Sequence, residues 1–233
     1  YIRLMSSKRV DGLIIAPTGR NVELLHSLQA RGMPLVTIDR PVPSLQAPFV
    51  GIDNQAAAQE AVTYLVQAGH SKIGMVAGLP DLQPVAERSL GFRSALAAAG
   101  LAVDEERIAL VESHELVQYR RASLATTDLL QRCPDTTALF ATNADLNVGV
   151  LYALHQLGVH YPQEISVVGF DDLEYFEIMP TPLTTVRQPA YRIGARAVEI
   201  LSRMIGGESP PAAPVLLETE LIVRSSVTSP PIR

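Results

Sequence analysis

The sequence ISVVGFDDLEYFEIMPTPLTTVRQP, residues 165–189, decides how the rest of the chain is interpreted. It begins with a short apolar run, 165–170, whose β-branched residues are typical of a strand buried on both faces of a parallel sheet. Two carboxylates, Asp171 and Asp172, follow where such a strand ends. Ligands of open α/β sheets bind beyond the carboxyl ends of the strands, so this pair is placed to accept hydrogen bonds from a polar ligand. A second extended run, 183–187, comes after two prolines.

Strands and helices alternate on both sides of this stretch. Short apolar runs predict strands at 10–16, 34–38, 48–52, 72–77, 107–111 and 137–142, and one or two more within 215–223. Apolar periodicity and end signals predict helices at 22–30, 55–68, 87–99, 119–132, 145–157 and 190–205. Residues 1–9 are expected to be the last turns of another helix. This alternation indicates a doubly wound α/β fold with right-handed crossovers.

Composition narrows the class of protein. A chain of 233 residues is long enough for one large domain or two lobes with cores of their own. The net charge of −5 gives no basic footprint for nucleic acid. The single cysteine, Cys133, excludes a disulfide framework within the chain. No apolar run approaches the roughly 20 residues that a membrane-spanning helix needs.

Several motifs occur together in one order along the chain. They are RVDGLIIAP at 9–17, GHSKIGMVAG at 69–78, RSLGFRSAL at 88–96, ALFATNADLNVGVLYAL at 138–154, VVGFDD at 167–172 and PLTTVRQP at 182–189. The fourth resembles the pattern A-x-F-x-x-N-D-x-x-A-x-G-x-x-x-A-L. In this order the motifs resemble the LacI/GalR family of bacterial transcription regulators over nearly the whole chain.

The resemblance implies two doubly wound parallel-sheet lobes, as in type I periplasmic binding proteins. Three crossovers near 50–53, 185–188 and 218–220 would join them, with the ligand in the cleft between the lobes. The N-terminal lobe would comprise 1–51 and 188–218, and the C-terminal lobe 52–187 and 219–233. The family's helix-turn-helix and hinge helix, and the first strand and most of the first helix of its N-terminal lobe, have no counterpart here. We therefore expect an incomplete N-terminal lobe.

The resemblance also implies ligand contacts at Asp39, Arg88, Asn143, Asp171 and Gln188. All five are polar groups at strand ends or near helix starts, as binding clefts require. Arg88 offers a rigid fork of donors, while Asn143 and Gln188 can both donate and accept. Structural roles fit the residues as well: Arg88 as a partner of Glu87 or of a neighbouring helix, Asn143 as a helix N-cap, and Asp39 as a turn residue. The resemblance implies no cofactor and no metal.

The chain departs from the family pattern in two places near this site. Ala144 follows Asn143 where the family has aspartate, and Asp145 comes one position later. The aromatic platform expected after the strand at 107–111 has only Val117 and Tyr119 as nearby candidates. These departures leave one ligand or capping contact and the aromatic contact open.

The residues argue against catalysis. Adjacent side chains on an extended chain point in opposite directions, so Asp171 and Asp172 are not expected to form a catalytic pair. There is no G-x-S-x-G motif and no G-x-G-x-x-G after a strand. The five histidines show no metal-binding spacing, and Cys133 has no His–acid partner in view. We therefore do not expect an enzyme.

The leading hypothesis is the ligand-sensing core of a cytoplasmic LacI-type regulator. A small polar metabolite, a sugar or a nucleobase-like compound, would control operator DNA binding through an N-terminal helix-turn-helix that this chain does not contain. We expect a homodimer formed through the apolar helix faces 56–61 and 148–154, and no membrane partner. The alternative is a periplasmic sugar-binding protein of an uptake system with the same architecture. A hydrolase on a doubly wound fold is a third class, for which no nucleophile–base pair is found.

Overall fold

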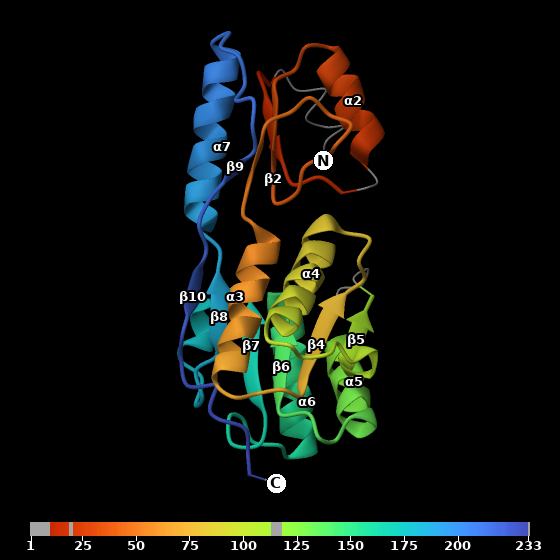
Figure 1. Cartoon of the computed structure of the whole chain (residues 1–233). Coiled ribbons are helices and arrows are strands. Elements are labelled where there is room, and N and C mark those ends of the chain that lie inside the picture. The colour runs from red at the N-terminus through yellow and green to blue at the C-terminus, as the bar shows by residue number, and fades with distance from the viewer. Residues whose placement is uncertain (1–9, 19–20, 113–117, 233) are drawn as a thin grey trace. The chain divides into compact units, whose positions relative to one another are not determined.

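The computed structural model describes residues 10–18, 21–112 and 118–232 of the chain. The predicted helix end at 1–9 and the candidate Val117 lie outside the described residues. The chain divides into two compact units, which we describe separately (Figure 1). The smaller unit consists of Tyr1–Asp53 and Pro189–Glu218, and the larger of Asn54–Gln188 and Thr219–Arg233.

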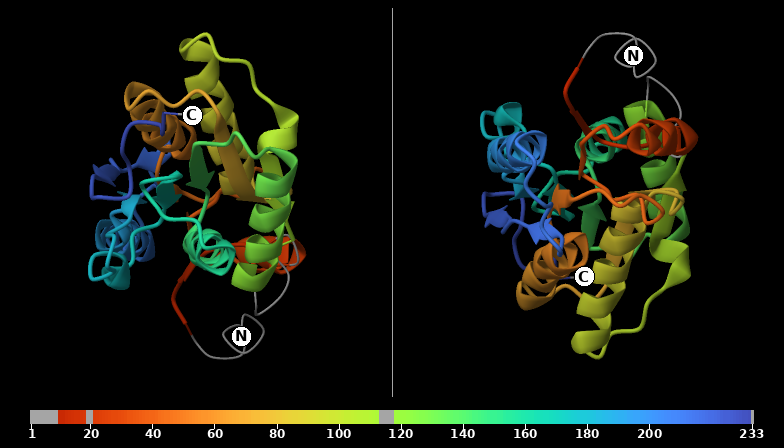
Figure 2. Two further views of the ribbon diagram at one scale, coloured as in Figure 1. Left: turned by 90° about the horizontal axis from the view of Figure 1, so that it is seen from below. Right: turned by 90° about the horizontal axis from the view of Figure 1, so that it is seen from above.

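The smaller unit is built on a parallel sheet in the order β1-β2-β3-β9. These strands are β1 (Leu13–Ile15), β2 (Leu35–Ile38), β3 (Phe49–Gly51) and β9 (Val215–Leu216). The helices α2 (Val22–Ala30) and α7 (Ala190–Ile205) lie on opposite sides of this sheet (Figures 1 and 2). Burial follows helical spacing in α7, where Ile193, Ala197 and Ile200 face inward because an amphipathic helix buries one stripe.

The larger unit contains a six-stranded sheet in the order β10-β8-β7-β6-β4-β5. The strands are β4 (Ile73–Gly78), β5 (Ile108–Val111), β6 (Ala138–Ala141), β7 (Ser166–Phe170), β8 (Thr184–Arg187) and β10 (Glu220–Ile222). Only β10 runs antiparallel to its neighbour, β8. Every residue of β4, β6 and β7 is buried, as in a sheet covered on both faces.

Two helix pairs cover the two faces of this sheet (Figure 2). One pair is α3 (Asn54–Gln67) with α4 (Gln83–Ala98), and the other is α5 (Gln118–Arg132) with α6 (Ala144–Leu157). Glycines let the helices of each pair approach closely. A Cβ at Gly91 would lie 2.3 Å from the carbonyl oxygen of Gln55, and one at Gly149 would lie 2.3 Å from the Cβ of Ala122. The expected doubly wound α/β fold is thereby confirmed.

The C-terminal segment, residues 224–232, lies at the end of the six-stranded sheet where β7 and β8 begin (Figure 1). Ser226 donates a hydrogen bond through Oγ to the carbonyl of Val167 at 2.6 Å and accepts one from the backbone of Thr184 at 2.8 Å. His70, which is buried, contacts Thr137 Oγ1 through Nδ1 at 2.9 Å and the Thr228 carbonyl through Nε2 at 2.8 Å. These hydrogen bonds join the segment to residues that are distant in sequence.

The start of one predicted helix was wrong. The helix expected at 87–99 begins at Gln83, because Pro84 occupies the first turn, where its missing N–H costs nothing. Two short 3₁₀ turns were not predicted, η2 (Glu105–Arg107) and η3 (Glu174–Phe176). Within the described residues, no helix is both long and apolar enough to cross a membrane.

Candidate functional site

Three of the five predicted ligand residues follow the carboxyl ends of parallel strands in the larger unit. Asn143 comes two residues after β6, Asp171 directly after β7 and Gln188 directly after β8. Because these strands are parallel neighbours in the sheet, their ends share one edge. Arg88 reaches the same edge from α4, so the larger unit brings four of the predicted residues together.

Asp171 is the centre of this group. Its Oδ1 accepts a hydrogen bond from Gln188 Nε2 at 2.6 Å, and its Oδ2 lies 3.8 Å from Arg88 Nη1. The side chain keeps 28% of its surface exposed, so the carboxylate can still be reached by a ligand. Its backbone adopts a left-handed conformation with φ of 70°, which aspartate tolerates better than most residues.

Arg88 is buried and held on several sides, with 5% of its surface exposed. Its Nε donates to Asn54 Oδ1 at 2.9 Å and its Nη1 donates to the Thr142 carbonyl at 2.7 Å. The guanidinium also lies 3.8 Å above the ring of Phe170, a favourable cation–π geometry. Asn54 lies on the neighbouring helix α3, so the structure shows the contact with a neighbouring helix that was one structural alternative for Arg88. Asn54 also donates through Nδ2 to Glu87 at 3.0 Å.

Asn143 is the N-cap of α6. Its Oδ1 accepts from the backbone N–H of Leu146 at 2.9 Å, which satisfies one of the unpaired donors of the first turn. The cap therefore forms with Ala144 in place of the family's aspartate. A contact between Asn143 and a ligand stays a prediction.

Asp172 points away from Asp171 and has a structural environment. Its carboxylate is bound by Arg224 at 2.7 Å, Thr185 at 2.6 Å and Arg187 at 2.6 Å. Burial by itself raises the pKa of Asp172, but the hydrogen bonds from these three residues outweigh it and lower the pKa from 3.8 to about 2. The two neighbouring aspartates thus have separate hydrogen-bond partners.

Asp39 directly follows β2 in the smaller unit. Its Oδ2 accepts from Arg40, with Nη2 at 2.7 Å and Nε at 2.8 Å. Its φ of 65° makes it, with Asp171, one of only two non-glycine residues with positive φ in the described parts of the chain. Both lie directly after a parallel strand. Its role in ligand binding stays a prediction.

The aromatic candidate Tyr119 packs edge-on against Tyr152 of α6, with ring centroids 6.3 Å apart. Its hydroxyl also accepts a hydrogen bond from Arg120 at 3.1 Å. Both contacts lie along the α5–α6 pair, so its role as a platform for a ligand stays a prediction.

Three residues that organise this site were missed by the sequence reasoning. Asn54 binds Arg88, Asn147 binds the backbone around Asp171, and Arg224 binds Asp172. Only Asn147 carried a usable signal, because it replaces the second alanine of the pattern that residues 138–154 resemble. The contacts of the other two span 34 and 52 positions, beyond any local pattern.

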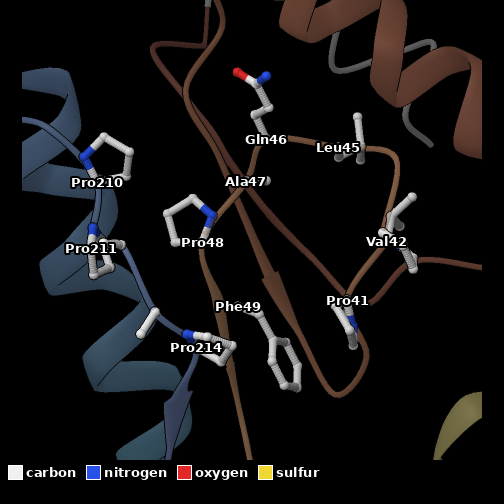
Figure 3. A pocket seen from close by; sticks show the side chains of 13 residues that line it. Pro41, Val42, Leu45, Gln46, Ala47, Pro48, Phe49, Pro210, Pro211 and Pro214 are labelled. Atoms are coloured by element: carbon white, nitrogen blue, oxygen red, sulfur yellow. The ribbon is translucent and has the colours of Figure 1, made fainter.

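Other features of the described residues do not form a second site of this kind. No group of three or more His, Cys, Asp and Glu residues there is placed to hold a metal ion, and the thiol of Cys133 is free and buried. A cavity of about 340 Å³ in the smaller unit lies between the segment Pro41–Phe49 and the segment Pro210–Pro214 (Figure 3). Gln46 supplies its only polar side chain, so it offers little to a polar ligand.

The chain is similar to a protein family and to several known proteins. Residues 62–227 match the family described as a periplasmic binding protein-like domain. The HTH-type transcriptional regulator CelR of Thermobifida fusca is 34% identical over 95% of this chain and 65% of its own length. The HTH-type transcriptional repressor CytR of Escherichia coli strain K12 is 30% identical over 99% of this chain and 67% of its own. A solved CelR–cellobiose complex matches with a TM-score of 0.87 and 32% identity, over 97% of this chain and 68% of that one.

The fold and the family match therefore define a periplasmic binding protein-like domain. Its relatives by sequence and by structure are transcriptional regulators. The chain belongs to the LacI/GalR family. It spans about two thirds of the length of the curated relatives that it matches, 65% of CelR and 62% of MalR of Streptomyces coelicolor.

Proposed function

We propose that this chain is the effector-sensing part of a LacI-type transcriptional regulator. A small polar metabolite binds at the carboxyl edge of the six-stranded sheet, and its binding controls how the whole regulator binds operator DNA. The observation that carries the proposal is the group formed by Asp171, Arg88 and Gln188, in which a partly exposed carboxylate in a left-handed turn faces a buried guanidinium and an amide. Asn143 and Asp39 are proposed as two further ligand contacts.

The chemistry of these groups favours a sugar as the effector. A carboxylate accepts hydrogen bonds from hydroxyl groups, the guanidinium donates to hydroxyl oxygens, and an amide does both. The structural relative CelR was solved with cellobiose, which is consistent with this choice. A nucleobase-like compound is the second chemical class that these donors and acceptors suit.

We propose that the protein senses this ligand rather than converting it. The separate environments of Asp171 and Asp172 support this, because Asp172 is held as a carboxylate by Arg224. We also propose a cytoplasmic location, as befits a regulator of transcription.

The regulator is proposed to work as a homodimer through one side of the larger unit. Large apolar side chains are exposed on α5, on α6, on the turn η3 and just after it: Leu124 at 73%, Tyr152 at 47%, Tyr175 at 46% and Ile178 at 83%. In the other face that the sequence suggested, at 56–61, Ala57, Ala58 and Ala61 are buried inside the unit, whereas Ala56 is exposed. Of the face at 148–154, Tyr152 is the residue that remains open to a partner.

A thermal-shift screen tests the proposed function. Sugars, sugar phosphates, nucleosides and nucleobases are added singly, and a ligand that binds only the native state at about 100 times its Kd stabilises by about 2.7 kcal/mol. We expect a sugar to raise the midpoint of wild-type unfolding and to have little effect on the Arg88→Ala variant. The proposal fails if no compound shifts the midpoint, or if the compound that does is consumed by the protein.

A further inference from the structure

We propose that Asn147 is the positioning residue that sets the ligand geometry of both Asp171 and Arg88. The inference rests on the proposed function of this site as the effector-binding site. Asn147 lies on α6 one turn after the N-cap Asn143 and is fully buried, so it is not itself a ligand contact.

The Asn147 amide holds the backbone where β7 ends. Its Nδ2 donates to the Phe170 carbonyl at 2.8 Å and lies 3.5 Å from the Asp171 carbonyl. Between these two carbonyls the chain passes through the left-handed conformation of Asp171. A residue in this region of φ persists only where its surroundings determine it, and the amide of Asn147 supplies such a constraint.

Gly169 provides the space for this amide. A Cβ at Gly169 would lie 2.4 Å from Asn147 Oδ1 and 2.6 Å from its Cγ and Nδ2, and these are the three nearest atoms. Gly169 is in a strand and its φ is not positive, so it is the volume rather than the backbone conformation that requires glycine. The Asn147 amide therefore packs in the space that the missing side chain of Gly169 leaves.

The hydrogen bond from Asn147 to the Phe170 carbonyl also affects Arg88, which lies over the Phe170 ring. Fixing the Phe170 carbonyl fixes the residue whose ring lies 3.8 Å below the Arg88 guanidinium. One buried amide thus orients the carboxylate through its backbone and the guanidinium through the aromatic ring.

The placement of Asn147 is not explained by stability alone. Within the described residues its Oδ1 is buried without a hydrogen-bond partner, which is unfavourable. The pattern that residues 138–154 resemble has an alanine at this position, and an alanine would bury no unpaired oxygen. The geometry that the amide imposes on Asp171 is what distinguishes the two residues.

The test separates geometry from packing with a compensated variant. Gly169→Ala alone brings a methyl group into the Asn147 amide, so we expect it to lower the midpoint of chemical unfolding. In the double variant Asn147→Ala/Gly169→Ala the methyl group occupies the space that the amide leaves. We therefore expect the double variant to recover most of the lost midpoint. NMR of the Gln188 side-chain amide, assigned by its loss in Gln188→Ala, reports the bond to Asp171 without any ligand. In the double variant we expect this signal to move to its position in Asp171→Ala.

Cellobiose titration adds the functional readout. We expect the affinity of the protein for cellobiose to be at least tenfold lower in the double variant than in wild type, although the stability is recovered. A Gln188 signal that stays at its wild-type position overturns the inference, as does loss of the fold in both Asn147→Ala and the double variant. If wild type does not bind cellobiose, cellobiose is not its effector, while the Gln188 signal still decides the role of Asn147.

Discussion

Among single residues, Asp171 combines the carboxylate of the proposed site with an uncommon backbone conformation. Its φ of 70° is easy for glycine and unfavourable for alanine by roughly 1–2 kcal/mol. We therefore expect Asp171→Gly to be more stable than Asp171→Ala by about that amount, although both lose the carboxylate. Chemical unfolding of the two variants checks this, and equal stability would contradict a left-handed conformation at this residue.

Asp172 is expected to matter for stability and little for the ligand. The side chain of its partner Arg224 is 9% exposed, and removing one member of such a largely buried ion pair leaves the other charge without this partner, at a cost of up to roughly 3–5 kcal/mol. We expect Asp172→Ala to cost this much, and Asp172→Ala/Arg224→Met to cost less than the sum of the two single variants. Urea unfolding of the three variants gives the comparison. Additive costs would mean that the two charges do not interact.

At the scale of elements, the C-terminal segment is attached to the sheet partly by His70. Burial lowers the pKa of His70 below its usual 6.5, and the hydrogen bond to the Thr228 carbonyl only partly offsets this. The folded state therefore favours neutral His70, while the unfolded chain takes up a proton near pH 6.5. Stability from this residue is complete above that pH and is lost as the pH falls below it.

Unfolding free energies measured between about pH 7.5 and about pH 5.5 test this attachment. We expect wild type to lose more stability over that range than His70→Gln, whose side chain does not titrate. His155→Gln, on an exposed position of α6, serves as the control and should behave as wild type. Parallel curves for wild type and His70→Gln would contradict a depressed pKa.

The elements themselves were largely predictable, and their long-range contacts were not. Asn143 and Gly158 mark the two ends of α6 in the sequence, and the structure shows both as caps. The start of α4 was placed too late because Leu82 offers no capping side chain. The contact of Arg88 with Thr142 joins residues 54 positions apart, so only the folded sheet reveals it. Sequence patterns report periodicity and ends, whereas the side-chain network depends on which strands become neighbours.

At the scale of the whole molecule, the proposed homodimer can be tested with charge. We expect the protein to sediment as a dimer at micromolar concentration, and Ile178→Glu or Leu124→Glu to shift it to monomer, because a charge in an apolar interface is costly. Leu90→Glu is the matched control: Leu90 is 51% exposed but lies on α4, which covers the other face of the sheet. A monomeric wild type, or a dimer unaffected by both variants, would contradict the proposed interface.

We expect a small polar ligand to bind at the carboxyl edge of the six-stranded sheet. Calorimetric titration of the ligand found by screening, into wild type and four single alanine variants, tests it most directly. Losing a charged hydrogen-bond partner typically costs about 2–3 kcal/mol, so Arg88→Ala and Asp171→Ala should bind roughly tenfold to a hundredfold more weakly, and Asn143→Ala more weakly than wild type. Asp172→Ala, measured where it remains folded, should bind nearly as wild type does. Unchanged affinity in all of the first three variants would contradict the site.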